Sequence, residues 1–297
     1  IATLMNRRYQ PSKSESGSSS SLYIDKPGNL NLLYGILMHG NPVSTMRLID
    51  VLYDKKNDNN GEGNGNTLFV IHVDGKEEND EAFDKLVEYS IDKDYVHIVP
   101  TEFRIRVNWG GFSMVQATLN ILKYSFALLP QGFTSTQLPK DPLEFHKFIH
   151  IASSTYPIKS NSQIRSTIAA YPLDANLVQI AMKPIEPHPA AWQYFVECDD
   201  VVHRIYRLHP LSNKAGNGID LYMGSQWFII SNEFALYLAN AKRGSMVQQF
   251  IEYAKHIIIA DEGFFSTVLR HSRFCTKHHN ANFLHLHFDR WESDLES

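Results

Sequence analysis

Two adjacent carboxylates, Asp261 and Glu262, stand where an apolar stretch of the sequence gives way to a helical pattern. Residues 264–269 repeat apolar side chains at the spacing of one helix face. A carboxylate in the first turn of a helix faces unpaired backbone N–H groups, which favour its ionised form. Such a pair is most often an ordinary N-terminal cap, but an ionised Glu beside an apolar helix also suits a general base. We predict Glu262 as the base and Asp261 as the cap.

The elements that must position this pair form an alternating pattern that begins near residue 31. Apolar runs at 32–39, 68–73, 95–99 and 148–152 predict strands, and helical patterns lie between them. This order predicts an α/β fold with a mainly parallel sheet and helices on both faces. Ligands of such sheets bind beyond the carboxyl ends of the strands, where His39, Gly40 and Asp74 fall. Further predicted elements are a helix capped by Ser44, helices at 80–89, 109–128, 233–240 and 246–258, and strands at 177–182 and 227–230.

The composition is that of a globular protein. The chain has 297 residues, of which 43% are hydrophobic and 20% charged, enough for one large domain or two small ones. A formal net charge of -4 argues against a dedicated nucleic-acid surface. The two cysteines, Cys198 and Cys275, either form one bridge or remain buried thiols.

The first 28 residues differ from the rest. They are rich in Ser and predict a flexible linker or stem, with the catalytic domain at 29–297. No apolar run approaches the ~20 residues that span a bilayer. Because the chain starts at Ile1 and not at Met, we expect that an upstream segment has been lost.

Six short sequence blocks follow one another along the chain: His-Gly at 39–40, Ile-His-Val-Asp at 71–74, Trp-Gly-Gly at 109–111, Tyr-Pro-Ile-Lys-Ser-Asn at 156–161, Gly-Ser-Gln-Trp-Phe at 224–228 and Asp-Glu at 261–262. In this order they resemble the blocks of the core-2/I-branching glycosyltransferases, a family that includes the xylosyltransferases. The resemblance covers roughly residues 31–291, and the blocks are most similar to those of the xylosyltransferase branch.

The resemblance implies a GT-A-type, Rossmann-like fold and an inverting transferase. The enzyme would move xylose, N-acetylglucosamine or glucuronic acid from a UDP-sugar to a hydroxyl of a glycan or glycoprotein. The residues it implies are Glu262 as base, His39, Gly40, Asp74, Trp109 and Gly110 for the nucleotide sugar, and Gly224, Ser225, Gln226 and Trp227 for the acceptor. It further implies that no divalent metal is needed, and a place in the Golgi lumen through an N-terminal anchor, as in type II membrane proteins.

Some positions depart from the family pattern. Thr155 stands where the family has Asp, and Gln226 stands where the xylosyltransferases have Asp, which weakens the expectation of peptide xylosylation. The chain ends at Ser297, before the family's basic residues that neutralise the departing diphosphate, so we expect a C-terminal truncation. The alternative function is a non-catalytic carbohydrate-binding remnant of the same fold.

Several other groups have two interpretations each. Trp109 and Trp227 either line a sugar site or pack in the core, and for Trp227 the core is favoured. Asp92-Lys93-Asp94 has the spacing of a metal motif but precedes a strand, as an exposed turn would. The cations Arg270, Arg273 and Lys277 either neutralise the diphosphate or are ordinary cations at a helix end. The histidines His278, His279, His285 and His287 either bind a metal, as in a hydrolase, or lie on an exposed strand edge.

Overall fold

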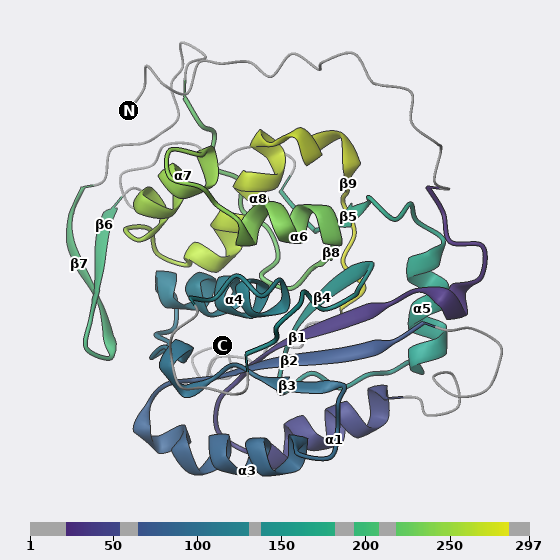
Figure 1. Cartoon of the computed structure of the whole chain (residues 1–297). Helices are drawn as coiled ribbons and strands as arrows, with labels where there is room; N and C mark the ends of the chain where they lie inside the picture. The colour runs from purple at the N-terminus through teal and green to yellow at the C-terminus, as the bar shows by residue number, and fades with distance from the viewer. Residues whose placement is uncertain (1–21, 54–64, 131–137, 182–192, 208–217, 285–297) are drawn as a thin grey trace, which may run out of the picture.

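A computed structural model describes residues 22–53, 65–130, 138–181, 193–207 and 218–284. Its main sheet runs β3-β2-β1-β4-β8-β5-β9, and a separate hairpin pairs β6 with β7 (Figure 1). The strands are β1 Leu32–Met38, β2 Thr67–Val73, β3 Val96–Ile98, β4 Lys147–Ala152, β5 Asn176–Leu177, β6 Gln193–Cys198, β7 Val201–Arg207, β8 Ile229–Ser231 and β9 His278–His279.

The sheet is mainly parallel, as predicted. β3, β2, β1 and β4 run in one direction, whereas β8 is antiparallel to both β4 and β5. Helices cover both faces, and the α/β fold is consistent with a GT-A-like Rossmann architecture. The helices are α1 Pro42–Leu52, α3 Asp80–Ser90, α4 Phe112–Ser125, α5 Asn161–Ala169, α6 Asn232–Ala239, α7 Met246–Ala254 and α8 Ala260–His271.

Side chains that alternate along the strands build one core on each face. From β1, Leu32, Tyr34 and Ile36 pack with α1 and α3 on the lower face of Figure 1. Leu33 of the same strand joins the cluster formed with α4, α6, α7 and α8 above the sheet. The sheet is therefore buried on both sides, and this explains why its strands are continuous apolar runs.

Two helix starts differ from the sequence prediction. Asn41, and not Ser44, caps α1, because the Asn41 Oδ1 accepts a hydrogen bond of 2.9 Å from the Val43 backbone N–H and Pro42 occupies the first turn. α5 was not predicted at all. It begins with a capping box in which Ser160 and Gln163 satisfy each other's backbone N–H groups.

The C-terminal half departs more from prediction. The strand predicted at 177–182 shortens to β5, because Ile180 pairs instead with Gly224 in an isolated bridge. α7 ends at Ala254, four residues before the predicted end, and Ile259 adopts a left-handed backbone (φ 54°). The hairpin β6–β7 was not predicted.

Both cysteines, Cys198 and Cys275, are free and exposed, so neither the bridge nor the buried thiol describes them. Within the described ranges, none of the helices combines the length and apolar character needed to cross a membrane. The predicted stem lies mostly outside the described residues, and the domain boundary at residue 28 remains a prediction.

Candidate active site

The carboxyl ends of β1 and β2 bring His39, Gly40 and Asp74 together, as predicted. The Asp74 backbone N–H donates to the Met38 carbonyl at 2.8 Å, which ties the two strand ends to each other. Gly40 has φ 76°, and its N–H donates to Oδ1 of the buried Asn79 at 2.8 Å. A left-handed backbone at this turn favours glycine. His39 is exposed beside it.

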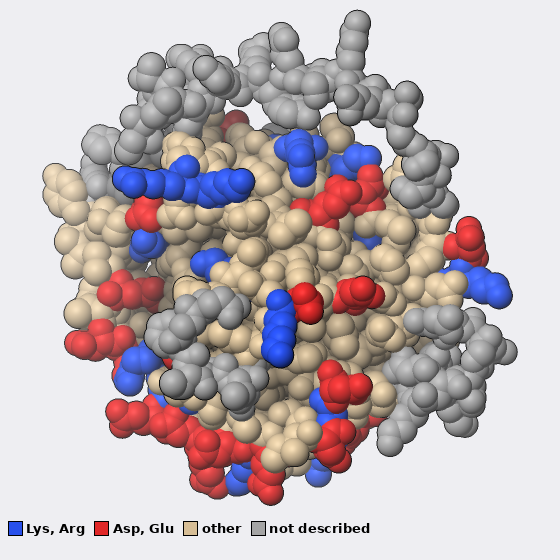
Figure 2. Space-filling model, in the orientation of Figure 1, with Lys and Arg blue, Asp and Glu red and all other residues tan. Residues whose placement is uncertain are grey.

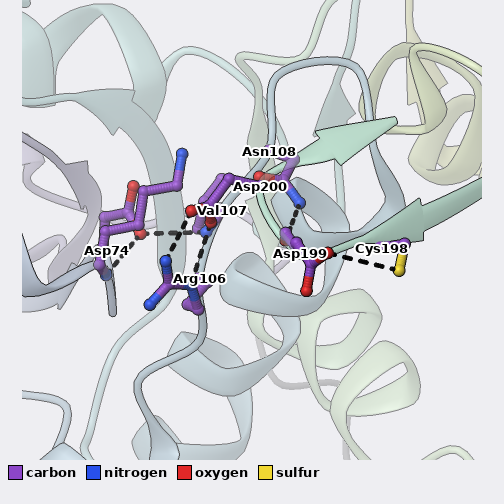
Figure 3. Close-up of polar contacts among 8 residues, drawn as sticks. Asp74, Arg106, Val107, Asn108, Cys198, Asp199 and Asp200 are labelled. Carbon is purple, nitrogen blue, oxygen red and sulfur yellow. Dashed lines mark hydrogen bonds and ion pairs between the residues drawn. The ribbon is translucent and has the colours of Figure 1, made fainter. Parts of the chain in front are cut away.

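The carboxylate of Asp74 holds a distant part of the chain. Asp74 is buried, and its Oδ1 accepts hydrogen bonds from the backbone N–H groups of Lys76 (3.2 Å) and Val107 (3.0 Å). The Asp74 carbonyl accepts one from Nη2 of Arg104 at 2.7 Å. Among the described residues none donates to Oδ2 of Asp74, so this oxygen is available to a ligand. Figure 3 shows the bond that joins Asp74 to Val107.

From Val107 the chain leads directly to Trp109 and Gly110. The Trp109 side chain is 79% exposed, so the core interpretation of this residue is wrong. Gly110 has φ 77°, and its carbonyl accepts a hydrogen bond of 2.7 Å from the Ile259 backbone N–H at the start of α8. The loop from Val107 to Gly110 thus connects the strand-end residues with the predicted base.

Glu262 lies in the first turn of α8, where it is half-buried. Burial raises the pKa of Glu262, which makes its carboxylate a better proton acceptor. Its backbone carbonyl accepts a hydrogen bond of 2.9 Å from Gly224 N–H. The predicted base and the predicted acceptor segment are therefore neighbours.

Asp261 is not the cap that we predicted. The N-cap position is Ile259, which makes no side-chain cap. Asp261 is buried, and among the described residues its Oδ1 has no hydrogen-bond partner. Burial raises the pKa of Asp261 to about 6, and the neighbouring charge of Glu262 adds to this shift.

The acceptor segment, residues 224–227, is fixed through its backbone. A Cβ on Gly224 would lie 2.2 Å from Oγ of Ser266, so only glycine fits there. Ser225 N–H donates to the Gln179 carbonyl at 2.8 Å, and Oγ of Ser225 accepts from Trp227 N–H at 3.1 Å. The Trp227 ring is half-buried and packs 5.0 Å from the ring of His150, which favours the core interpretation.

The hairpin adds contacts that sequence reasoning missed. Glu197 of β6 accepts hydrogen bonds from the Ser113 N–H (2.9 Å) and Oγ (2.5 Å), at the N-terminus of α4. Asp200 forms an ion pair with Arg106 (Nη2 to Oδ2, 2.6 Å), and Nδ2 of Asn108 donates to the Asp199 carbonyl at 3.3 Å (Figure 3). In the sequence, only the adjacent acidic residues Asp199 and Asp200 marked this turn as a possible site.

The other charged candidates lie elsewhere. Arg270 and Arg273 stand over the rings of Tyr222 and Phe274, and Lys277 forms an ion pair with Asp174, so these cations fit the helix-end interpretation. The exposed Asp92 and Asp94 precede β3, as expected for a turn. They therefore lie at the amino ends of the parallel strands, whereas Asp74 lies at the carboxyl ends.

The predicted histidine cluster receives no support as a metal site. Nε2 of His278 lies 2.8 Å from the Val178 carbonyl, which leaves that nitrogen occupied. Across the part of the chain that the structure describes, no group of three or more His, Cys, Asp or Glu side chains could hold a metal ion. His285 and His287 lie outside the described residues.

One face of the molecule is markedly acidic. Figure 2 shows acidic side chains gathered over α3, at the bottom of the view. Those on α3 and the turn before it are exposed: Glu77, Glu78, Asp80, Glu81, Asp84 and Glu88. Such a surface repels a polyanion, in agreement with the net charge.

Comparison with known proteins gives the same family as the sequence blocks. The family model of the Core-2/I-Branching enzymes matches residues 62–295, and the chain belongs to this family. The chain is 25% identical to Xylosyltransferase oxt of Drosophila melanogaster over 76% of its length. It is 22% identical to Xylosyltransferase 1 of Rattus norvegicus over 84% of its length.

A relative of a second type is similar to the same degree. The chain is 22% identical over 80% of its length to the Beta-1,3-galactosyl-O-glycosyl-glycoprotein beta-1,6-N-acetylglucosaminyltransferase 4 of Mus musculus. The matches cover 23%, 27% and 47% of the fly, rat and mouse proteins. The chain thus spans less than half of the length of each of these relatives, and their names do not agree on one sugar.

Proposed function

We propose that this protein is an inverting glycosyltransferase that moves a sugar from a UDP-sugar to a hydroxyl of a glycan or glycoprotein. Membership of the family supports glycosyl transfer as the class of reaction. The names of the relatives support xylose or N-acetylglucosamine as the sugar, and glucuronic acid is the third candidate. Gln226, in place of the Asp of the xylosyltransferases, argues against a peptide acceptor for xylose.

The observation that carries the proposal is the position of Glu262. Its helix α8 begins against the Gly110 carbonyl, which belongs to the Trp109 loop, and its own carbonyl binds Gly224 of the acceptor segment. A sugar bound beside Trp109 and a hydroxyl bound beside Gly224 would therefore meet near one half-buried carboxylate.

The reaction follows from this arrangement. Glu262 accepts the proton of the acceptor hydroxyl while the hydroxyl oxygen forms a bond to the anomeric carbon. The bond from that carbon to the diphosphate oxygen breaks on the opposite side, and its electron pair leaves with UDP. A single displacement of this kind inverts the anomeric configuration. A carboxylate with a raised pKa suits the proton transfer, because its proton affinity lies closer to that of the developing acid.

In this proposal Asp74 binds the uracil side of UDP through its Oδ2, and no divalent metal takes part. The second point rests on the family resemblance, which implies that no divalent metal is needed. UDP binding measured by calorimetry should be unchanged by EDTA. Binding that is lost with EDTA and restored by manganese would contradict a metal-free site.

Transfer can be tested with a panel of UDP-xylose, UDP-N-acetylglucosamine and UDP-glucuronic acid against peptide and glycan acceptors. We expect one donor to be used, with the product in the inverted configuration. Glycan binding without transfer from any donor would instead support the alternative, a carbohydrate-binding remnant. The retained Glu262 favours the enzyme.

We further propose that the full-length protein resides in the Golgi lumen with an N-terminal anchor, as a type II membrane protein. The basis is the family resemblance and the Ser-rich stretch at the start of the chain. Fluorescence imaging of the tagged full-length protein should show Golgi staining, and a protein made without any anchor or signal would contradict this location.

A further inference from the structure

A buried histidine, His150, packs against Trp227 of the predicted acceptor segment and has so far been given no role. His150 is in the middle of β4, it has no exposed surface, and its ring packs among the rings of Phe148, Trp227, Phe228 and Phe265. A fully buried polar ring in an otherwise apolar strand needs partners for both of its nitrogens. The structure provides them: Nδ1 lies 3.0 Å from the Gln226 carbonyl oxygen, and Nε2 lies 3.1 Å from Oγ1 of Thr118.

The chemistry of these partners fixes the tautomer of the ring. A carbonyl oxygen can only accept, so Nδ1 of His150 must carry the hydrogen that points to Gln226. Burial lowers the pKa of His150 to about 4, and the ring is therefore neutral at physiological pH. Nε2 is then an acceptor for the hydroxyl of Thr118 on α4, whose single hydrogen is shared with the Met114 carbonyl at 3.2 Å from Oγ1.

The imidazole continues the sheet beyond the end of its backbone ladder. β4 and β8 pair from Lys147 to Ile149, and the His150 N–H still donates to the Phe228 carbonyl at 2.9 Å. The next contact in the same direction is made by the side chain, because Nδ1 reaches the carbonyl of Gln226, two residues further along. The ring thus holds a segment that the β4 backbone no longer reaches.

That segment is the one predicted to bind the acceptor. Its other end is held by the hydrogen bond from Gly224 N–H to the carbonyl of Glu262. Among the described residues no hydrogen bond engages the Gln226 side chain, so the protein fixes the backbone of this residue and leaves its amide available. His150 and Glu262 therefore hold this segment at two places, the carbonyl of Gln226 and the N–H of Gly224.

We infer that His150 is a positioning residue of the transfer reaction, whose Nδ1–H fixes the Gln226 carbonyl and so aligns the acceptor segment with Glu262. The inference rests on the proposed function for its kinetic consequence but not for its structural one. It assigns His150 to acceptor binding and leaves donor binding to the Asp74 and Trp109 side of the site.

Two substitutions of His150 test the contacts of the two ring nitrogens separately. In His150→Asn the side-chain amide nitrogen takes the place of Nδ1 and can still donate to the Gln226 carbonyl, while the contact with Thr118 is lost. In His150→Gln the amide oxygen takes the place of Nε2 and can still accept from Thr118, while the Gln226 carbonyl is left without its donor. Thr118→Val is the matched control, because it removes only the partner of Nε2.

We expect His150→Gln to raise the acceptor KM by about 3- to 10-fold, the worth of one hydrogen bond, with the Kd for UDP unchanged. His150→Asn and Thr118→Val should stay within about 3-fold of the wild type in acceptor KM. Equal acceptor KM values for His150→Gln and His150→Asn, or a parallel loss of UDP affinity, would overturn the positioning role.

Two measurements on the purified protein do not depend on transfer. Nitrogen-15 NMR of the His150 ring should show a protonated Nδ1 and an unprotonated Nε2 at neutral pH. Amide hydrogen exchange of Ser225 and Trp227 should be faster in His150→Gln than in Thr118→Val. A ring protonated at Nε2, or equal exchange in the two variants, would contradict the inference, whereas absence of transfer in a wild-type protein that passes both tests would contradict only the proposed function.

Discussion

Asp74 and the pair Asp261–Glu262 were predicted from equivalent signals, a carboxylate at a strand end and carboxylates at a helix start, but the fold treats them in opposite ways. Asp74 accepts two backbone hydrogen bonds through one oxygen and fixes the loop that carries Trp109. Asp261 and Glu262 are desolvated, and burial raises the pKa of both. For Asp261 this effect exceeds the opposite effect of the backbone N–H groups of Asp261 and Glu262.

The difference shows how one site can hold carboxylates for different tasks. Backbone N–H groups keep the orientation of the Asp74 carboxylate, as a binding residue requires. Burial raises the pKa of Glu262 and so its proton affinity, which suits a general base.

The largest effect should come from the base. Glu262→Gln keeps the shape of the side chain and removes its ability to accept a proton, so transfer should fall by about 10²–10⁴-fold. The Kd for UDP should not change, because the base acts on the acceptor. Steady-state kinetics together with calorimetry would measure both quantities.

Asp261→Asn is the matched control for this substitution. Its carboxyl lies one residue away, is buried, and is replaced by a neutral group of the same shape, so transfer should change little. Near-normal transfer in Glu262→Gln, combined with complete loss in Asp261→Asn, would show that the base had been assigned to the wrong residue of the pair.

The next effect concerns donor binding. Asp74→Asn can keep the hydrogen bonds at Oδ1 and loses the negative charge and the acceptor Oδ2. The Kd for UDP should rise by about 10- to 100-fold, because hydrogen bonds to charged groups are worth roughly 1.5–3 kcal/mol. The thermal unfolding midpoint serves as the control for folding. If UDP binds this variant as tightly as the wild type, then the role of Asp74 is confined to holding the loop.

The third effect is on stability, through Asp261. Its folded-state pKa of about 6 exceeds the ordinary value of 3.8, so between these pH values the folded protein binds more protons than the unfolded chain. The free energy of unfolding should therefore fall by about 2–3 kcal/mol as the pH rises from 4 to 6, and stay lower above that. Urea unfolding of the wild type and of Asp261→Asn would test this, because the substitution should remove this part of the pH dependence. A wild-type curve that rises over the same range and is matched by the variant would contradict the burial of the Asp261 carboxyl.

The sequence predicted the parts of the site that depend on local patterns. The predicted strand ends gave the correct positions of His39, Gly40 and Asp74, because apolar runs mark the strands of a sheet that is buried on both faces. Helical spacing located α8 to within a residue or two. What the sequence could not show was where each polar atom finds its partner.

The errors follow from that limit. Asp261 has the pattern of a cap, yet the left-handed backbone at Ile259 places it inside the first turn and buries it. Glu197 stands 84 residues from Ser113 in sequence, and His150 stands 76 residues from Gln226. Such contacts are set by tertiary packing, and no periodicity along the chain indicates them.

The smallest effect concerns the hairpin β6–β7. Of its two carboxylates, Asp200 pairs with a cation at the surface, whereas Glu197 is more buried and accepts hydrogen bonds. Asp200 and Arg106 form a pair in which both side chains are nearly half exposed, and such pairs add little stability and are screened by salt. Asp200→Asn should lower the unfolding midpoint by about 1–2 °C at low ionic strength, and this difference should vanish in about 1 M salt.

Glu197→Gln is the comparison, because Glu197 is more buried and faces the N-terminus of α4, where a negative charge is stabilising. Its loss should lower the midpoint by about 2–4 °C and persist in salt, since partly buried charges are less screened. Equal decreases for the two variants with the same salt dependence would mean that the hairpin is held by surface charge alone and that burial at the N-terminus of α4 adds nothing.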